Sequence, residues 1–80
     1  MHIMSAMNQI VHIRKGVFSV SQAEFAEIAG TTQSSVSRWE RGELEPSRSE
    51  MTRIREAAIA RGLAWDDVWF FESPPTETAA

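Results

Sequence analysis

Residues that end helices divide this chain into short segments. Glycines stand at positions 30, 42 and 62, and a glycine readily adopts the left-handed conformation that commonly follows the last turn of a helix. Pro46 comes shortly after Gly42 and excludes a helix that would run through both positions. The sequence also shows no alternation of apolar and polar residues of the kind that indicates a strand. These features predict several short helices.

Two serine-to-glutamate motifs predict where helices begin. Ser21-Gln-Ala-Glu24 and Ser47-Arg-Ser-Glu50 are capping boxes, in which the serine hydroxyl accepts from the amide three residues on and the glutamate reaches back to the serine amide. Thr32 is a simpler N-cap candidate. Starts and stops together predict five helices, at about Ser5–Lys15, Gln22–Ala29, Gln33–Arg41, Arg48–Arg61 and Trp65–Phe71.

Apolar residues at helical spacing define the predicted core. The fold class that follows is all-α, a compact bundle of about five short helices, and 80 residues make one small domain over residues 1–72. The tail Ser73–Ala80, with its two consecutive prolines, is expected to be disordered. The predicted core residues are Ile10 with Ile13 or Val11, then Phe25, Ala26, Ile28, Ala29, Val36 and Trp39, and in the fourth helix Met51, Ile54, Ala57 or Ala58, and Ile59.

Several kinds of chemistry have no residues to support them. The chain has no cysteine, and His2 and His12 are isolated, so neither a metal site nor a cofactor is expected. No nucleophile elbow or paired-carboxylate site is visible, so the protein is not expected to be an enzyme. The apolar runs fall far short of the roughly 20 residues that span a bilayer, and no signal peptide is present. A cytoplasmic protein without membrane association is expected.

The charges are distributed unevenly. The net charge of −3 disfavours a nucleic-acid ligand, but all eight lysines and arginines lie in residues 1–61. Residues 62–80 contain four acidic residues and no basic one. This asymmetry fits a body with a basic face and an acidic end that is turned away from DNA.

The segment Gln22–Gly42 carries the functional information. Two helices of about two turns are joined by a short turn that begins at Gly30. Ala26 is small, as is needed where two helices cross closely. The second helix presents a polar, positively charged outer face, while Glu40 points elsewhere. The inward residues are Phe25, Ala29, Thr31, Val36 and Trp39, and the outward ones are Gln33, Ser34, Ser37, Arg38 and Arg41.

This segment resembles the Cro/lambda-repressor-like (XRE-type) helix-turn-helix regulators. The resemblance spans residues 10–71 and implies a lambda-repressor-like fold with a central helix-turn-helix at about residues 22–42. The matching motifs are S-Q-x-x-F-A-x-x-A-G (Ser21–Gly30), T-Q-S-S-V-S-R-W-E-R-G (Thr32–Gly42) and E-P-S (Glu45–Ser47).

The resemblance implies roles for individual residues. Gln33, Ser34, Ser37 and Arg38 fall where the family contacts base edges; glutamine suits adenine and arginine suits guanine. Contacts to the DNA backbone are implied for Gln22, which also supports the recognition helix, and for Ser35 and Arg41. Apart from the resemblance, Arg48 is the one arginine of the fourth helix placed near a phosphate path, and it is predicted to contact the DNA backbone as well.

The resemblance also implies a pairing within the domain. Glu40 is similar to a family glutamate that pairs with an arginine of the first helix, here Arg14. Between Arg14 and Gln22, however, this chain carries one residue more than is usual in the family.

The fifth segment contains four aromatic residues, Trp65, Trp69, Phe70 and Phe71, called here the aromatic cluster. So short a helix cannot bury all four within one subunit, and one or two are expected to cover the subunit's own core. Contiguous exposed aromatic residues usually mark an interface. The aromatic cluster is therefore predicted to form a homodimer surface.

The favoured function is a homodimeric repressor or autoregulator of a phage, plasmid or local operon that binds double-stranded DNA at a palindromic operator. One alternative is the antitoxin of a toxin–antitoxin pair, which would bind a toxin as well as DNA. Another is a helix-turn-helix scaffold used only for protein–protein contact, which the polar outer face disfavours.

Overall fold

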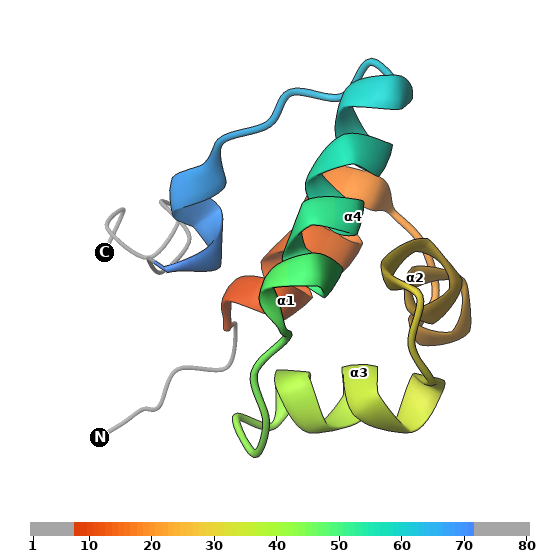
Figure 1. The fold of residues 1–80 in the computed structure, drawn as a ribbon, viewed down its shortest axis with the longest axis vertical. Coiled ribbons are helices and arrows are strands. Elements are labelled where there is room, and N and C mark those ends of the chain that lie inside the picture. The colour runs from red at the N-terminus through yellow and green to blue at the C-terminus, as the bar shows by residue number, and fades with distance from the viewer. Residues whose placement is uncertain (1–7, 72–80) are drawn as a thin grey trace.

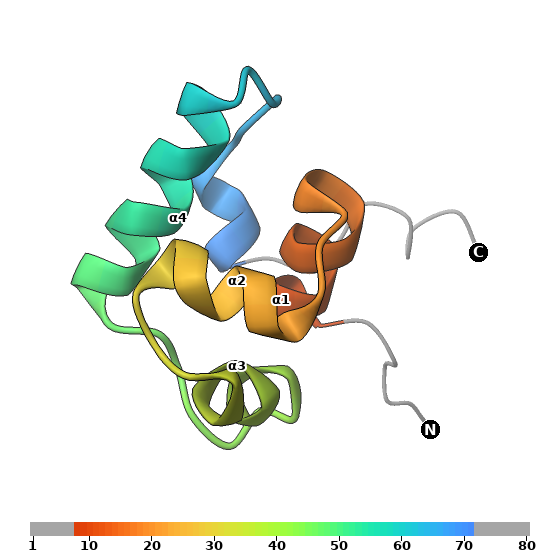
Figure 2. The ribbon, with the colours of Figure 1, turned by 90° about the vertical axis from the view of Figure 1, so that its right-hand side faces the viewer.

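Helices form all the regular structure in the computed structural model, which describes residues 8–71 (Figures 1 and 2). The fold is all-α, as predicted. Within the described residues, no helix has the length and apolar character needed to cross a membrane. The elements in order are α1 (Gln9–Val11), the π-helical segment η1 (His12–Phe18), α2 (Gln22–Ala29), α3 (Gln33–Glu40), α4 (Arg48–Ala60) and the 3-10 turn η2 (Asp67–Phe70).

The predicted starts and stops of the central helices are confirmed. At α2, Ser21 Oγ accepts from the Glu24 amide at 3.1 Å and Glu24 Oε1 accepts from the Ser21 amide at 3.2 Å. At α4, the Ser47–Glu50 box has the same two bonds, of 3.2 and 2.7 Å. Thr32 Oγ1 caps α3 by accepting from the Ser35 amide. Glycines 30, 42 and 62 have φ angles of +75°, +77° and +72°, which are left-handed conformations.

The first helix differs from the prediction at both ends. Its N-cap is Asn8, whose Oδ1 accepts from the Val11 amide at 2.9 Å; the predicted start at Ser5 lies outside the described residues. α1 continues directly into η1, so the helix extends past Lys15 to Phe18. There the Ser19 amide donates to the Arg14 carbonyl, five residues back.

The π-helical segment η1 overlaps the stretch between Arg14 and Gln22 that contains the additional residue. A π turn uses one residue more than an α turn, so Ile13 and Phe18 lie on the same side of the helix although they are five residues apart. Both are buried in the core.

The core lies where α1, η1, α2, α3 and α4 meet. Predictions are confirmed for most positions, but Ile59 is wrong because it is 55% exposed. Ile28 and Met51 are only half-buried, and Met51 does not belong to the core cluster. Phe18 was not predicted and packs with its ring edge against Phe25, at 5.7 Å between centroids. The buried apolar residues are Ile10, Ile13, Phe18, Phe25, Ala26, Ala29, Val36, Trp39, Ile54 and Ala58.

The C-terminal segment is a 3-10 turn where a helix over Trp65–Phe71 was predicted. Asp66 Oδ1 caps it by accepting from the Val68 amide at 3.1 Å, and the turn lies beside α1 (Figure 1). The Trp69 ring meets the His12 ring at 5.3 Å. Three members of the aromatic cluster pack against the core, not one or two as expected. Phe71 is the exception and is 69% exposed.

Candidate nucleic-acid interface

Helix α3 lies across α2 on the outside of the molecule, as the two views together show (Figures 1 and 2). Val36 and Trp39, three residues apart, are buried and fix the inner face of α3 against the core. The helix ends at Glu40, and beyond the left-handed Gly42 the Glu43 amide donates to the Arg38 carbonyl at 2.9 Å. This is the pattern of a Schellman motif, and it satisfies a carbonyl that the helix itself leaves free.

The outer face of α3 carries most of the predicted base-reading residues. Gln33, Ser34 and Arg38 are exposed along it, and Ser37 is half-buried. Ser37 Oγ accepts a hydrogen bond from Arg41 Nη1. These side chains offer amide, hydroxyl and guanidinium groups to solvent, and these groups can pair with the polar edges of bases.

Glu40 is the centre of a hydrogen-bond network behind this face. Its carboxylate accepts from Arg14 Nε and from Nη2 (3.2 Å), and from Gln22 Nε2 at 3.0 Å. The Arg14 and Glu40 side chains are each only 11% exposed. Arg14 also donates to the Val20 carbonyl at 3.0 Å. The pairing that the resemblance implied is thus present despite the additional residue.

Gln22 connects this network to the start of α3. Its Nε2 donates to Glu40 at the end of the helix, and its Oε1 accepts from Gln33 Nε2 at 3.4 Å. The half-buried Gln22 therefore contacts both ends of α3, in agreement with the supporting role that the resemblance implied.

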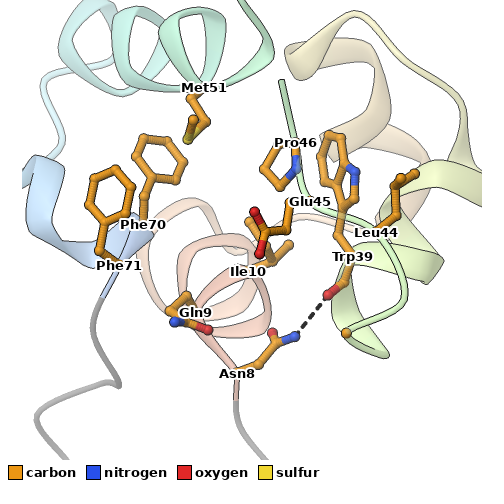
Figure 3. A pocket seen from close by; sticks show the side chains of 11 residues that line it. Asn8, Gln9, Ile10, Trp39, Leu44, Glu45, Pro46, Met51, Phe70 and Phe71 are labelled. Carbon is orange, nitrogen blue, oxygen red and sulfur yellow. Dashed lines mark hydrogen bonds between the residues drawn. The ribbon is translucent and has the colours of Figure 1, made fainter. Parts of the chain in front are cut away.

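Asn8 holds the C-terminal end of α3 from the other side. Its Nδ2 donates to the carbonyl oxygens of Trp39 and Glu40, at 2.9 Å each; Figure 3 shows the bond to Trp39. Carbonyls in the last turn of a helix lack partners within the helix, so Asn8 satisfies two of them. The sequence analysis missed Asn8 because it placed the start of the first helix at Ser5. An asparagine just before Ile10 is the N-cap signal that could have found it.

Two of the residues predicted to contact the DNA backbone, Ser35 and Arg48, lie in the first turns of α3 and α4. Ser35 is half-buried in the first turn, where its Oγ accepts from Thr32 Oγ1 at 3.1 Å. Arg48 is exposed in the first turn of α4, at the end of that helix nearest α3 (Figure 1).

Arg41, also predicted to contact phosphate, is exposed and already paired. It forms a bidentate ion pair with Glu43, with Nε–Oε2 at 3.0 Å and Nη2–Oε1 at 3.3 Å. Hydrogen bonds from the Arg41 guanidinium, and its charge, hold the pKa of the Glu43 carboxyl below its ordinary value. The same bonds raise the pKa of Arg41.

A pocket of about 300 Å³ lies beside the end of α3, between α1, the α3–α4 loop and η2 (Figure 3). Leu44 and Phe71, two of the large apolar side chains exposed in the described part of the chain, line it. Between residues 8 and 71, no group of three or more metal-ligating side chains is placed to hold a metal ion.

Comparison with known families gives one match. Residues 18–61, more than half of the chain, match a family model described as helix-turn-helix. Neither a curated protein nor a solved structure matches the chain. The matched range includes α2, α3, α4 and all the residues predicted to contact DNA. Arg14, Asn8 and the aromatic cluster lie outside it.

Proposed function

The chain belongs to the Cro/lambda-repressor-like family of DNA-binding helix-turn-helix domains, and from this membership we propose that it is a transcriptional regulator that reads specific DNA sequences through α3. The observation that carries the proposal is the placement of α3. Its polar face is exposed, while Asn8, Arg14 and Gln22, all outside α3, hold the helix through hydrogen bonds to its C-terminal end. A rigidly held helix with such a face is what insertion into a major groove requires.

Base recognition is assigned to the exposed side chains of α3. Gln33 and Arg38 have the amide and guanidinium groups that pair with adenine and guanine, each through two hydrogen bonds. Ser34 and Ser37 complete the reading face with hydroxyl groups. The link from Gln22 to Gln33 favours this assignment because it limits the orientations that the Gln33 amide can adopt before DNA is bound.

Phosphate contacts are assigned to the residues around the rim of α3. These contacts set the register of the protein on the duplex and add affinity without sequence preference. Arg41 and Arg48 supply positive charge, and the amides in the first turns of α2 and α3 supply hydrogen-bond donors. Gln22 and Ser35 stand at these two helix starts.

We further propose a homodimeric repressor or autoregulator that binds a palindromic operator. One domain of this size contacts one half-site, and two-fold symmetry doubles the contacts, with half-sites about one helical turn apart. The aromatic cluster of Trp65, Trp69, Phe70 and Phe71 is the proposed dimer surface. The exposure of Phe71 beside the exposed Leu44 supports it.

The experiment is selection of duplexes from a random-sequence library, followed by binding measurements with variants. The wild-type protein should enrich a palindromic sequence. Arg38→Ala or Gln33→Ala should cost about 1–3 kcal/mol of operator affinity and relax base preference at one position in each half-site. Circular dichroism should stay unchanged, because both residues are exposed.

Arg61→Ala is the matched control for the loss of a positive charge. Arg61 caps the end of α4 that lies away from α3 (Figure 1), so its loss should leave base preference intact. Wild-type affinity and preference in both α3 variants would show that this helix does not read DNA.

A further inference from the structure

The loop after α3 contains an acidic group inside the proposed DNA surface. Glu43 engages Arg41 through two hydrogen bonds, of 3.0 and 3.3 Å, while Arg41 Nη1 donates to Ser37 Oγ. Nε, Nη1 and Nη2 of the guanidinium thus all have partners within the protein. Two of the residues assigned to DNA contact, Ser37 and Arg41, are therefore already bound to each other or to Glu43.

The geometry of this pair is also that of a phosphate contact. A guanidinium binds carboxylate and phosphate in the same bidentate manner, with two parallel N–H···O bonds. Glu43 therefore occupies the place on Arg41 that a DNA phosphate would take. The two cannot bind the same edge of the guanidinium at once.

The surroundings of the pair make it exchangeable. Both side chains are 54% exposed, and an ion pair in water contributes little to stability. The Glu43 carboxylate is charged at neutral pH even at its ordinary pKa, and the hydrogen bonds and charge of Arg41 lower that pKa further. A phosphate held firmly against Arg41 can replace it, whereas a loosely approaching phosphate meets a guanidinium that is already neutralised.

We propose that Glu43 lowers the affinity for the operator by competing with DNA phosphate for Arg41. The proposal rests on the DNA-binding function proposed above. In an operator complex, seating of α3 in the groove presses Arg41 against one phosphate and displaces Glu43. On non-specific DNA, where the base contacts that seat α3 are missing, Arg41 stays paired with Glu43 and contributes little. Glu43 therefore weakens operator binding by the full cost of breaking its pair with Arg41. It weakens non-specific binding by no more than this, because the pair persists there only when it outweighs the phosphate contact.

Glu43→Gln provides the direct test, with Glu45→Gln as the matched control. Glu45 is exposed in the same loop, and within residues 8–71 the ion pairs do not include it. The probes are a fluorescent duplex of scrambled sequence and the operator recovered by selection. Glu43→Gln should tighten binding to the operator by roughly two- to five-fold, because Arg41 no longer has to leave Glu43. Binding to the scrambled duplex should tighten by no more than this, and its salt dependence should steepen by about one ion as Arg41 becomes free to pair with phosphate.

Arg41→Ala separates competition from general repulsion between Glu43 and DNA. If Glu43 acts through Arg41, Glu43→Gln should have no further effect on binding when Arg41 is already alanine. The proposal would be overturned if Glu43→Gln had the same effect on binding with and without Arg41. It would also be overturned if Glu45→Gln had the same effect as Glu43→Gln. Either outcome would mean that only the overall charge of the protein matters.

The two proposals fail in different ways. If the wild-type protein and Glu43→Gln bind no duplex even at low salt, the DNA-binding function is wrong and this inference falls with it. If the wild-type protein selects and binds an operator but Glu43→Gln binds that operator no more tightly, the inference alone is wrong.

Discussion

Two arginine–glutamate pairs of similar geometry stand in very different surroundings. Arg14 and Glu40 are each 11% exposed, whereas Arg41 and Glu43 are each 54% exposed. Water solvates the outer pair almost as well when it is separated, so its contribution to folding is small. In the inner pair, loss of one partner leaves a poorly solvated charge.

We therefore expect Arg14→Met to lower the free energy of unfolding by about 3 kcal/mol, and Arg41→Met to lower it by less than about 1 kcal/mol. Urea denaturation followed by circular dichroism measures both. The paired design controls for the loss of an arginine and of its hydrogen bonds to glutamate. Equal losses would contradict the view that burial makes the Arg14–Glu40 pair important for stability.

At the scale of single residues, the sequence predicted the side chains whose hydrogen-bond partners are close along the chain. It missed most of the side chains whose partners are far along the chain. The caps Ser21, Thr32 and Ser47 were predictable because their partners are three residues away. The contacts of Asn8 reach Trp39 and Glu40, 31 and 32 residues along the chain, and no local pattern encodes them. The Arg14–Glu40 pairing could be anticipated from the family resemblance but not from spacing.

At the scale of elements, the regular helices were predictable and the two irregular ones were not. α2, α3 and α4 have explicit starts and glycine stops, and their boundaries agree with the prediction to within a residue. The π-helical geometry of η1 depends on which side chains are buried in the core, and no local sequence pattern shows this. The sequence signal was the one additional residue between Arg14 and Gln22. η2 is short and rich in aromatic residues, which are weak helix formers, and too few residues are available to nucleate an α-helix.

The π-helical segment gives a test at the level of one element. Deletion of Gly16, which is exposed in η1, brings Ile13 and Phe18 to the four-residue spacing of an α-helix. Both side chains should remain in the core, and the melting temperature should equal or exceed that of the wild type, because a glycine is removed from the helix interior. Thermal unfolding followed by circular dichroism provides the measurement.

Deletion of Glu27 is the control for this test. Glu27 is exposed in the regular helix α2, where removal of one residue turns Ala29 by about 100° away from the core. This variant should fail to fold. If the Gly16 deletion unfolds the domain in the same way, the wide turn is required by the fold and does not merely accommodate an additional residue.

At the scale of the whole molecule, the proposed dimer depends on the part of the aromatic cluster that the core leaves uncovered. Trp69 packs on His12 and on Trp65, so its substitution would disturb folding and assembly together. Phe71 is 69% exposed and separates the two effects. Phe71→Ser should shift sedimentation toward the monomer and weaken operator binding, while thermal stability stays close to that of the wild type.

Ile59→Ser is the matched control, because Ile59 is a large apolar residue exposed on α4. It should leave both sedimentation and operator binding unchanged. A wild-type protein that sediments as a monomer at micromolar concentration would overturn the homodimer. The aromatic cluster would then serve its own core or a different protein, as the antitoxin alternative requires.

The separation between the outer and inner faces of α3 has an evolutionary consequence. Gln33, Ser34 and Arg38 are exposed, whereas Val36 and Trp39 anchor the same helix in the core. Exposed substitutions usually change stability by less than about 0.5 kcal/mol, so the outer residues can drift without penalty to folding. After gene duplication, two copies could diverge to different operators through a few changes on one helix face. Under the proposed function, the same property makes this domain a starting point for engineered DNA-binding proteins that do not cross-react.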